Sequence, residues 1–502
     1  LYFEGVNQVA EVFVNSQPAG KHTGGYTAFS IPIGRYLKFG AGGMTANEVS
    51  VKVDNSANPD IPPLSADFSF FGGIYRDVYL VAASPVHFNM DNFAAPGIRI
   101  KTPDVNNDKA GILVEGSISN TLNKTNGLKI SCDITDARGA IISHSEKKLN
   151  VPGMGQAAFS ISQTVKAPHL WSPADPYLYH VVARIADAHT GEVLDEQDSE
   201  LGLRWFSFDA DKGFFLNGKP LKLIGANRHQ DFREMANALP NALHERDMEL
   251  LKNMGGNFSR IAHYPQDSAV LQACDRLGIL ASGEIPIVNE ITESKAFSNN
   301  CLTMQTEMIR QNFNHPSVII WAYMNEVLLH PHFQKGSQQQ KDYFAHLVTL
   351  AKSIDSLTHA EDPSRYTMIP CHGDFNLYTS TGLADVPQIV GWNLYSGWYS
   401  AGLEGFEKFL DHYHQAMPHK PMIVTEFGAD ADFHSHSLQP ERFDKTVEYE
   451  VIYHRHYIKQ IMDRPFVAGA TVWNLVDFNS EFRSESTPHV NTKGLVTDTR
   501  QP

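Results

Sequence analysis

Hydrophobic and polar residues alternate along the first part of the chain. Ala10, Val12 and Val14 are separated by residues such as Glu11, which is the period of two that a half-buried strand shows. The segment NSQPAG that follows contains the residues of a tight turn. GGYTAFSIPI and NEVSVKVDN are further short runs between Gly, Pro and Asn breaks, so residues 1–85 are predicted to form a β region.

The β pattern continues over residues 86–203. Turn-forming residues separate the candidate strands GILVEGSISN, LKISCDITDARG, AAFSISQTVKAP and YLYHVVARIADAHTGEVLDEQ. This spacing of strands and turns predicts a small β-sandwich of about 100 residues.

From residue 204 onward, short apolar runs alternate with stretches of helical period such as ERDMELLKNMG and TMQTEMIRQNF. The eight apolar runs that are candidate strands are LKLIGAN, NFSRIAH, GILASGEIP, SVIIWAYMNE, RYTMIP, QIVGWNLY, MIVTEFG and VAGATVWN. Eight strand–helix units in about 300 residues predict a TIM barrel over residues 204–502.

Composition and charge narrow the class of protein. The 502 residues are 42% hydrophobic and 19% charged, and they contain no apolar run of the ~18 residues that a membrane span requires. The net charge of −15 argues against binding to nucleic acid or to an anionic membrane. The four cysteines are scattered and form no Cys-x-x-Cys pair, so neither a zinc knuckle nor a disulfide framework is predicted. The histidines near His330 and His434 are expected in solvated loops, and we predict no metal and no cofactor.

Polar side chains gather where the predicted barrel strands end. In a TIM barrel these ends surround the active site. In chain order they carry Asn227, Arg228, His229, Arg260, His263, Tyr264, Glu284, Asn325, Glu326, Asn393, Tyr395, Glu426, Trp473 and Asn474. We therefore expect a polar site with aromatic residues at this end of the barrel.

Two carboxylates in this set suggest a particular chemistry. Glu326 and Glu426 follow the fourth and seventh strands, whose sequences are almost entirely apolar. An ionised carboxylate at such a place is costly unless it is paired or used. These two strands lie on opposite sides of the barrel mouth, so the carboxylates can face each other, as hydrolysis of a glycosidic bond requires. The alternative is that each Glu forms a structural ion pair, for example with Arg260 or Arg228.

At these residues the chain resembles glycoside hydrolase family 2, which includes β-galactosidases, β-glucuronidases and β-mannosidases. The blocks that carry the resemblance occur in family order along essentially the whole chain: FEGVNQVAEVFVN, FFGGIYRDVYL, LWSPADPYLYHV, FFLNGKPLKLIGANRHQDF, RIAHYP, FNHPSVIIWAYMNE, NLYSGWY, IVTEFGAD and VWNLVDF. The resemblance implies a jelly-roll sugar-binding domain (1–85), an immunoglobulin-like β-sandwich (86–203) and a catalytic TIM barrel (204–502). It also implies that the chain is cut at both ends, because part of the jelly-roll would precede Leu1 and the last barrel helix would follow the final residues.

The resemblance further implies roles for individual residues. Glu326 corresponds to the general acid/base and Glu426 to the nucleophile of a retaining mechanism, with their carboxyls about 5–5.5 Å apart. The pKa of the acid/base should be raised to near neutral in the free enzyme, while the nucleophile stays ionised. Asn325 corresponds to the residue that binds the sugar 2-hydroxyl, and Tyr395 to the tyrosine beside the nucleophile. The other implied sugar contacts are Asp67, Arg228, His229, His263, Glu284, Asn393 and Trp473.

The identity of the sugar is left open between several interpretations. Asn491 and Lys493 form an Asn-x-Lys element that resembles the part of family β-glucuronidases that grips the glucuronate carboxylate. Related bacterial β-galactosidases carry a similar element, and Pro488-His489-Val490 stands where family glucuronidases tend to have an arginine, with Arg483 further off. We therefore place β-galactosidase first, β-glucuronidase second and β-mannosidase third. A non-catalytic carbohydrate-binding protein on this fold would be expected to lack one carboxylate, and both are present.

The resemblance to bacterial polysaccharide-degrading enzymes implies a substrate with a terminal β-linked sugar on an oligo- or polysaccharide. It also implies export to the periplasm or beyond the cell. The sequence leaves open whether the protein is a homo-oligomer.

Overall fold

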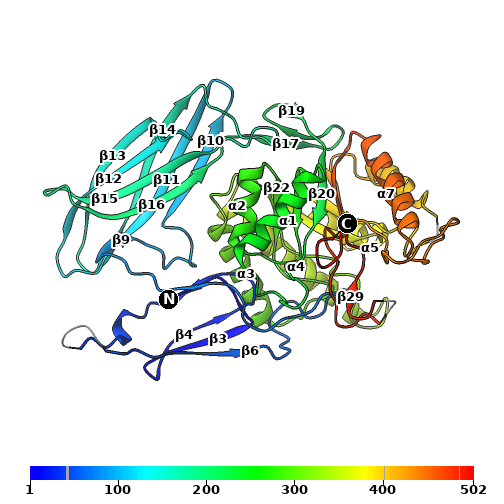
Figure 1. The fold of residues 1–502 in the computed structure, drawn as a ribbon, viewed down its shortest axis with the longest axis horizontal. Helices are drawn as coiled ribbons and strands as arrows, with labels where there is room; N and C mark the ends of the chain where they lie inside the picture. The colour runs from blue at the N-terminus through cyan, green and yellow to red at the C-terminus, as the bar shows by residue number, and fades with distance from the viewer. Residues whose placement is uncertain (41–44, 401, 485–486, 502) are drawn as a thin grey trace.

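The computed structural model describes residues 1–40, 45–400, 402–484 and 487–501. An N-terminal β region and a β-sandwich lie beside a barrel (Figure 1). The rest of the chain forms this barrel, with a small sheet before it and a hairpin after it. The fold is therefore multidomain, with β layers followed by a TIM barrel, as the sequence predicts.

The N-terminal β region consists of three small antiparallel sheets with the strand orders β5–β1–β8, β2–β7 and β4–β3–β6. Along β3, Ala10, Val12 and Val14 are buried and the residues between them are partly exposed, so the predicted alternation is present. The elements are β1 (Tyr2–Phe3), β2 (Val6–Asn7), β3 (Val9–Val14), β4 (Gln17–Thr23), β5 (Phe29–Ser30), the 3-10 helix η1 (Gly34–Tyr36), β6 (Val49–Asp54), β7 (Gly73–Ile74) and β8 (Val78–Tyr79).

The β-sandwich packs two antiparallel sheets against each other. One sheet has the order β10–β11–β14 with β9 paired to β11, and the other has the order β13–β12–β15–β16. Leu128, Ile130, Cys132 and Ile134 on β12 all face the shared core and are fully buried. The strands are β9 (Val86–Phe88), β10 (Ile98–Val105), β11 (Lys109–Asn120), β12 (Asn126–Thr135), β13 (Ile141–Val151), β14 (Gly155–Lys166), β15 (Tyr179–Asp187) and β16 (Val193–Leu201).

Eight parallel strands then form a closed barrel in the order of the sequence. A small sheet of β17 (Phe206–Asp209), β18 (Gly213–Leu216) and β19 (Lys219–Pro220) precedes it. The barrel strands are β20 (Leu223–Asn227), β21 (Phe258–Ile261), β22 (Leu280–Glu284), β23 (Val318–Ala322), β24 (Tyr366–His372), β25 (Ile389–Asn393), β26 (Met422–Glu426) and β27 (Val467–Val472). Seven of the eight predicted apolar runs contain one of these strands whole, and the run RYTMIP overlaps β24, which continues two residues further to His372. The barrel prediction is therefore confirmed.

Helices alternate with the barrel strands. They are α1 (Asn241–Asn253), α2 (Ser268–Leu277), α3 (Lys295–Gln311), α4 (Gln338–Glu361), α5 (Phe375–Ser380), η2 (Leu383–Asp385), α6 (Gly405–Ala416) and α7 (Val447–Met462). A two-stranded hairpin of β28 (Phe478–Asn479) and β29 (Val490–Asn491) follows β27. Within the described ranges, no helix is long and apolar enough to cross a membrane.

Local sequence determines where helices such as α2 and α3 begin or end. The hydroxyl of Ser294 accepts hydrogen bonds from the N–H groups of Ala296 and Phe297 at the start of α3. Helix α2 ends at Gly278, whose φ of +70° lies in the left-handed region that favours glycine. A Cβ atom there would also lie 2.8 Å from the Cα of Pro173, so the close approach of the preceding region requires glycine as well.

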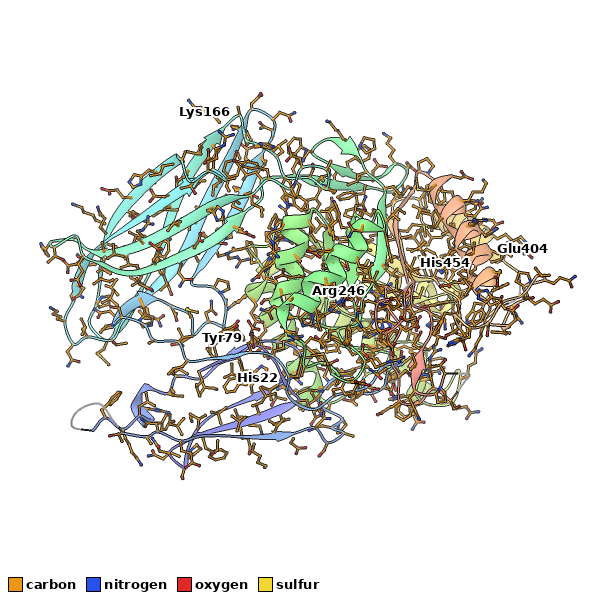
Figure 2. The ribbon with its side chains drawn as sticks, in the orientation of Figure 1. His22, Tyr79, Lys166, Arg246, Glu404 and His454 are labelled. Carbon is orange, nitrogen blue, oxygen red and sulfur yellow. The ribbon has the colours of Figure 1, made fainter. Side chains whose placement is uncertain are left out.

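Buried polar contacts join the two β regions to the barrel. His22, labelled in Figure 2, lies with Nε2 3.0 Å from Oε1 of Glu307 on α3, and the hydroxyl of Thr27 donates to Oε2 at 2.6 Å. Near the sandwich, the indole N–H of Trp171 donates to the carbonyl of Asp275 at 2.8 Å. Because such groups are costly to bury without partners, these contacts fix the β regions in place against the barrel.

Candidate active site

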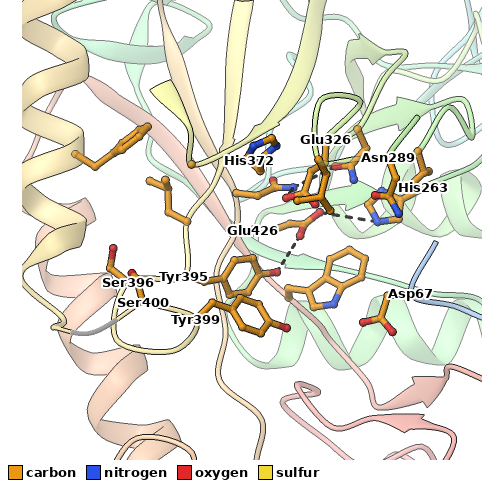
Figure 3. Close-up of a pocket in the computed structure, with 18 of the residues that line it drawn as sticks. Asp67, His263, Asn289, Glu326, His372, Tyr395, Ser396, Tyr399, Ser400 and Glu426 are labelled. Carbon is orange, nitrogen blue, oxygen red and sulfur yellow. Dashed lines mark hydrogen bonds and ion pairs between the residues drawn. The ribbon is translucent and has the colours of Figure 1, made fainter. Parts of the chain in front are cut away.

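A cavity of about 530 Å³ opens where the parallel strands of the barrel end (Figure 3). Ligand pockets usually have volumes of about 300–1,000 Å³, so the cavity is large enough for a small ligand. Of the predicted site residues, Asp67, His263, Asn325, Glu326, Asn393, Tyr395, Glu426 and Trp473 line it. The structure thus brings both predicted carboxylates into one cavity, and Asp67 reaches it from the N-terminal β region.

Glu326 lies four residues beyond the end of β23, with a backbone φ of +50°. This left-handed conformation is strained for a residue with a side chain, and such strain is concentrated at functional sites. The side-chain amide of Asn393 donates a hydrogen bond of 2.9 Å to Oε1 of Glu326. Burial, followed by the charge of Glu426, raises the pKa of Glu326 to about 8. Glu326 therefore holds a proton at neutral pH, as a general acid must.

Glu426 is the last residue of β26 and is only 5% exposed. Arg260 donates from Nη1 to Oε1 of Glu426 at 2.7 Å, and Tyr395 donates its hydroxyl to Oε2 at 2.8 Å. Burial, and then the charge of Glu426, hold the pKa of Tyr395 well above its ordinary value, so the hydroxyl keeps its proton. These two donors fix the orientation of the carboxylate.

Arg260 connects the carboxylate to the layer beneath the cavity. Its fully buried guanidinium donates to both oxygens of Glu284, at 2.9 and 3.0 Å, and to Oδ1 of Asn325 at 2.9 Å. It also donates to Oδ1 of Asn227 at 3.2 Å. The ends of β20, β21, β22 and β26 are therefore joined through one side chain.

An aromatic wall lies beside the carboxylates. The rings of His263 and Trp473 stack with their centroids 4.9 Å apart, and both line the cavity. Phe68, next to Asp67, lies 6.0 Å from His263 between ring centroids. A flat wall of this kind, beside hydrogen-bonding groups, suits the apolar face and polar rim of a sugar ring.

Five of the predicted sugar contacts do not line the cavity: Arg228, His229, Glu284, Asn491 and Lys493. Arg228 is fully buried and donates to Asp247 at 2.9 Å, so its charge is used beneath the site. His229 is enclosed by aromatic rings, which lie 4.2 Å away for Phe478 and 5.2 Å away for Trp473. Burial, with nearby positive charges, holds the pKa of His229 well below its ordinary value.

Asn491 and Lys493 lie behind the cavity wall and contact residues that line it. Asn491 donates its side-chain amide to Oδ2 of Asp67 at 3.0 Å. Lys493 is 1% exposed, and its ammonium group donates to Asp430, which is also buried. The same ammonium lies 5.0 Å from the ring centroid of Tyr399, which lines the cavity.

Sequence reasoning missed Arg483 as a site residue. Its Nε donates to both oxygens of Asp67, at 2.9 and 3.0 Å, and its Nη1 donates to Asp430 at 3.0 Å. Burial opposes the charge of Arg483, but the hydrogen bond and charge of Asp67 raise its pKa, so it stays cationic. The available signal was the acidic residue in the segment EFGAD, because a buried Asp430 requires cations beside it.

Several other residues that line the cavity were not among the predicted site residues. These include Asn289, His372, Ser400 and Phe409. His372 is the last residue of the fifth barrel strand, so the rule applied to the other strands would have found it. Within the described ranges, no group of three or more His, Cys, Asp or Glu side chains is arranged to hold a metal ion.

Comparison with known proteins identifies relatives over the whole chain. The family model described as glycosyl hydrolases family 2, TIM barrel domain, matches residues 210–502, and the model described as glycosyl hydrolases family 2 matches residues 97–204. A β-glucuronidase of Bacteroides fragilis is 34% identical over 100% of this chain and 70% of its own length. A β-galactosidase of Thermoanaerobacter pseudethanolicus is 28% identical over 96% of this chain and 58% of its own length.

A solved structure agrees closely with this fold. It is that of Bacteroides uniformis β-glucuronidase 2 covalently bound to cyclophellitol-6-carboxylate aziridine, with a TM-score of 0.97 and 42% identity. The match covers 100% of this chain and 59% of that chain. A Formosa agariphila protein that is 34% identical over 99% of this chain is likewise matched over 59% of its own length. The chain thus spans about three fifths of these two relatives.

Proposed function

Because the chain belongs to glycosyl hydrolase family 2, we propose that it is the catalytic part of a retaining β-glucuronidase. Its substrate would be an oligo- or polysaccharide ending in a β-linked glucuronate. Three groups of residues would have separate roles. The two carboxylates perform the chemistry and the aromatic wall holds the sugar ring. Arg483, which contacts Asp67 at the cavity wall, binds the acid group of the sugar.

The reaction would proceed in two displacements. Glu426 attacks the anomeric carbon while Glu326 gives its proton to the glycosidic oxygen, so the carbon–oxygen bond breaks and a glycosyl ester forms on Glu426. Glu326, now ionised, then takes a proton from water, whose oxygen attacks the anomeric carbon and releases Glu426 as a carboxylate. The raised pKa of Glu326 supports the first role, and the two donors on Glu426 support its orientation as nucleophile.

The observation that carries the choice of sugar is Arg483 on the wall of the cavity. A guanidinium offers the paired N–H donors that recognise a carboxylate, whereas a neutral galactosyl group requires no cation. Lys493 lies behind the same wall and adds a second positive charge. The B. uniformis relative, whose structure holds an inhibitor with a 6-carboxylate, supports the same choice. We therefore reverse the order drawn from sequence, which placed β-galactosidase first.

β-Galactosidase remains the second candidate because of one observation. Arg483 and Lys493 already contact Asp67 and Asp430, so their charges are partly neutralised inside the protein. In that case the network would bind sugar hydroxyls, and the T. pseudethanolicus relative is named for this activity.

The experiment compares 4-nitrophenyl β-D-glucuronide with 4-nitrophenyl β-D-galactoside for the wild type, Arg483→Gln and Lys493→Met. We expect the glucuronide to be preferred. A hydrogen bond to a charged group is worth about 1.5–3 kcal/mol, so we expect each variant to lower kcat/KM for the glucuronide by roughly 10- to 100-fold. Activity on the galactoside should change by less than about threefold.

The matched control is Arg246→Gln, which removes the same charge from an exposed position on α1 (Figure 2). It should leave both activities unchanged. A wild type that prefers the galactoside, and whose preference is unaffected by Arg483→Gln, would establish the second candidate instead.

A further inference from the structure

The order of the strands divides the cavity into two opposite walls. β27, β20 and β21 are neighbours in the closed barrel, and β24 and β25 lie across from β20 and β21. Asp67 belongs to the first wall because it contacts Ser480 and Asn491, which follow β27. Figure 3 shows the same division, with Asp67 and His263 on one side of Glu426 and Ser396 on the other.

The reaction geometry places the sugar ring of the substrate on one wall and its leaving group on the other. This step rests on the proposed function, in which the acid group of the sugar lies by Arg483 and its anomeric carbon lies by Glu426. The sugar ring then covers the first wall, so the leaving group must extend toward the second. Glu326, which protonates the leaving oxygen, follows β23, the direct neighbour of β24. We propose that the second wall, formed by His372, Ser396, Ser400 and Phe409, is the leaving-group subsite and binds a second sugar residue.

His372 supplies a neutral hydrogen-bond donor to this subsite. Its Nδ1 lies 3.0 Å from the hydroxyl of Tyr378, a buried residue whose pKa is held well above its ordinary value by burial. We assign the hydroxyl of Tyr378 as the donor to Nδ1, because this hydroxyl keeps its proton and Nδ1 is the acceptor beside it. This assignment puts the imidazole proton on Nε2, where it is available to the cavity that His372 lines. Burial also lowers the pKa of His372, which keeps the ring neutral at neutral pH.

The rest of the second wall combines an aromatic surface with hydroxyl groups. Phe409 on α6 packs against Trp392 at a centroid distance of 4.9 Å, which fixes its ring beside the cavity. Ser396 and Ser400 add hydroxyls. A Cβ atom at Gly405 would lie 2.9 Å from the Oγ of Ser396, so glycine at this position leaves that hydroxyl its space. An aromatic surface edged by an N–H and two hydroxyls matches a pyranose, whose faces carry C–H groups and whose rim carries hydroxyls. A flat aromatic leaving group would require only the apolar part.

The test separates the two walls by the size of the leaving group. β-D-Glucuronosyl fluoride has a leaving group that occupies no subsite, whereas β-D-glucuronosyl-(1→4)-glucose and its (1→3)-linked isomer fill the second wall. We expect His372→Ala and Phe409→Ala each to lower kcat/KM for at least one disaccharide by roughly 3- to 10-fold, the worth of one neutral contact. Hydrolysis of the fluoride should change by less than about twofold, and its persistence reports a folded enzyme.

Two further variants complete the experiment. Ser400→Trp places a bulky side chain at an exposed position, so it should retain the fold, block the disaccharides and spare the fluoride. His434→Ala, at an exposed loop position, is the matched control and should change nothing. Parallel losses for fluoride and disaccharide, or no loss for any variant, would overturn the subsite.

The glycone is tested separately by running the corresponding β-D-galactosyl fluoride and disaccharides. Failure of the wild type on the glucuronosyl compounds with turnover of the galactosyl compounds would contradict the proposed sugar. The ratio between disaccharide and fluoride within the active series would still decide whether the second wall binds a sugar.

Discussion

Arg260 donates a hydrogen bond of 2.7 Å to Glu426, the predicted nucleophile. The sequence presented a structural ion pair and a catalytic carboxylate as alternatives for this residue. The structure contains the ion pair at the wall of the candidate active site, so the two interpretations coexist. The guanidinium offsets the cost of burying the charge of Glu426 and leaves its second oxygen to Tyr395.

Replacing Arg260 with Lys should destabilise the protein and reduce its activity together. One ammonium group cannot reach Glu284, Asn227, Asn325 and Glu426 at once, so buried acceptors would lose their partners. We expect a loss of about 3–5 kcal/mol in the free energy of unfolding of the barrel, measured by urea denaturation. Arg246→Lys on the surface should stay within about 0.5 kcal/mol of the wild type. Equal stability of the two variants would contradict this account.

The pKa of Glu326, about 8, predicts the alkaline limit of activity. The protonated form is the acid, so kcat/KM for a substrate with a poor leaving group should fall as the pH rises above about 8. Glu326→Gln should lower that activity by about 10²–10⁴-fold. A glycosyl fluoride, whose leaving group needs no proton, should lose much less in the variant and should lack the alkaline fall. An alkaline limb of the same size for both substrates would show that another group titrates.

Asn393 affects the alkaline limit of activity, because it changes the pKa of Glu326. Its amide donates to Glu326 at 2.9 Å, and this hydrogen bond lowers the pKa of Glu326 against the effect of burial. Asn393→Ala should therefore move the alkaline limb to higher pH while lowering kcat. The pH dependence of kcat/KM on a disaccharide measures the shift. A limb that moves to lower pH would mean that the contact favours the protonated acid instead.

Asp477 predicts how stability depends on pH. Burial raises the pKa of Asp477 from about 3.8 to about 8, helped by the charge of Glu450, although the N–H of Gly494 donates to it at 2.8 Å. Between these two values the folded state holds a proton that the unfolded state has lost, so stability should fall as the pH rises through this window. Asp477→Asn should remove this fall, with a gain of at least the order of 1 kcal/mol at pH 9 and little change at pH 4.

Thermal unfolding of the wild type and Asp477→Asn across pH 4–9 checks this expectation. Asp463→Asn, an exposed residue at the end of α7, serves as the control for a lost surface charge. Parallel curves for the wild type and Asp477→Asn would show that the proton on Asp477 has no effect on stability.

Local pattern accounts for what the sequence predicted well. The apolar runs of the barrel strands and the polar residues directly after them placed Glu326, Glu426 and Asn393 at one end of the barrel. The rule that active-site residues follow the ends of the barrel strands predicts where the backbone lies. It does not predict the direction in which each side chain points. Arg228 and Glu284 therefore have the predicted position along the chain, yet their side chains are used beneath the cavity.

Contacts between distant segments could not be predicted in this way. Asp67 and Arg483 are 416 residues apart, and neither periodicity nor spacing indicates that they meet. Along the sequence, Arg483 lies further from Lys493 than the arginine that family glucuronidases tend to carry. In the fold, the hairpin of β28 and β29 brings both residues to Asp430. Whether β-galactosidase or β-glucuronidase is placed first depends on this shared contact of Arg483 and Lys493 with Asp430.

The contact of Asp67 with Ser480 and Arg483 also limits which parts of the gene can be exchanged by recombination. A barrel that carried its whole pocket could be recombined as a cassette among proteins without changing the sugar it accepts. Here the residues of the pocket wall are encoded by two distant stretches of the gene. An exchange of the N-terminal β region between homologues would transfer part of the specificity with it, so this segment and the barrel are expected to have been inherited as one unit.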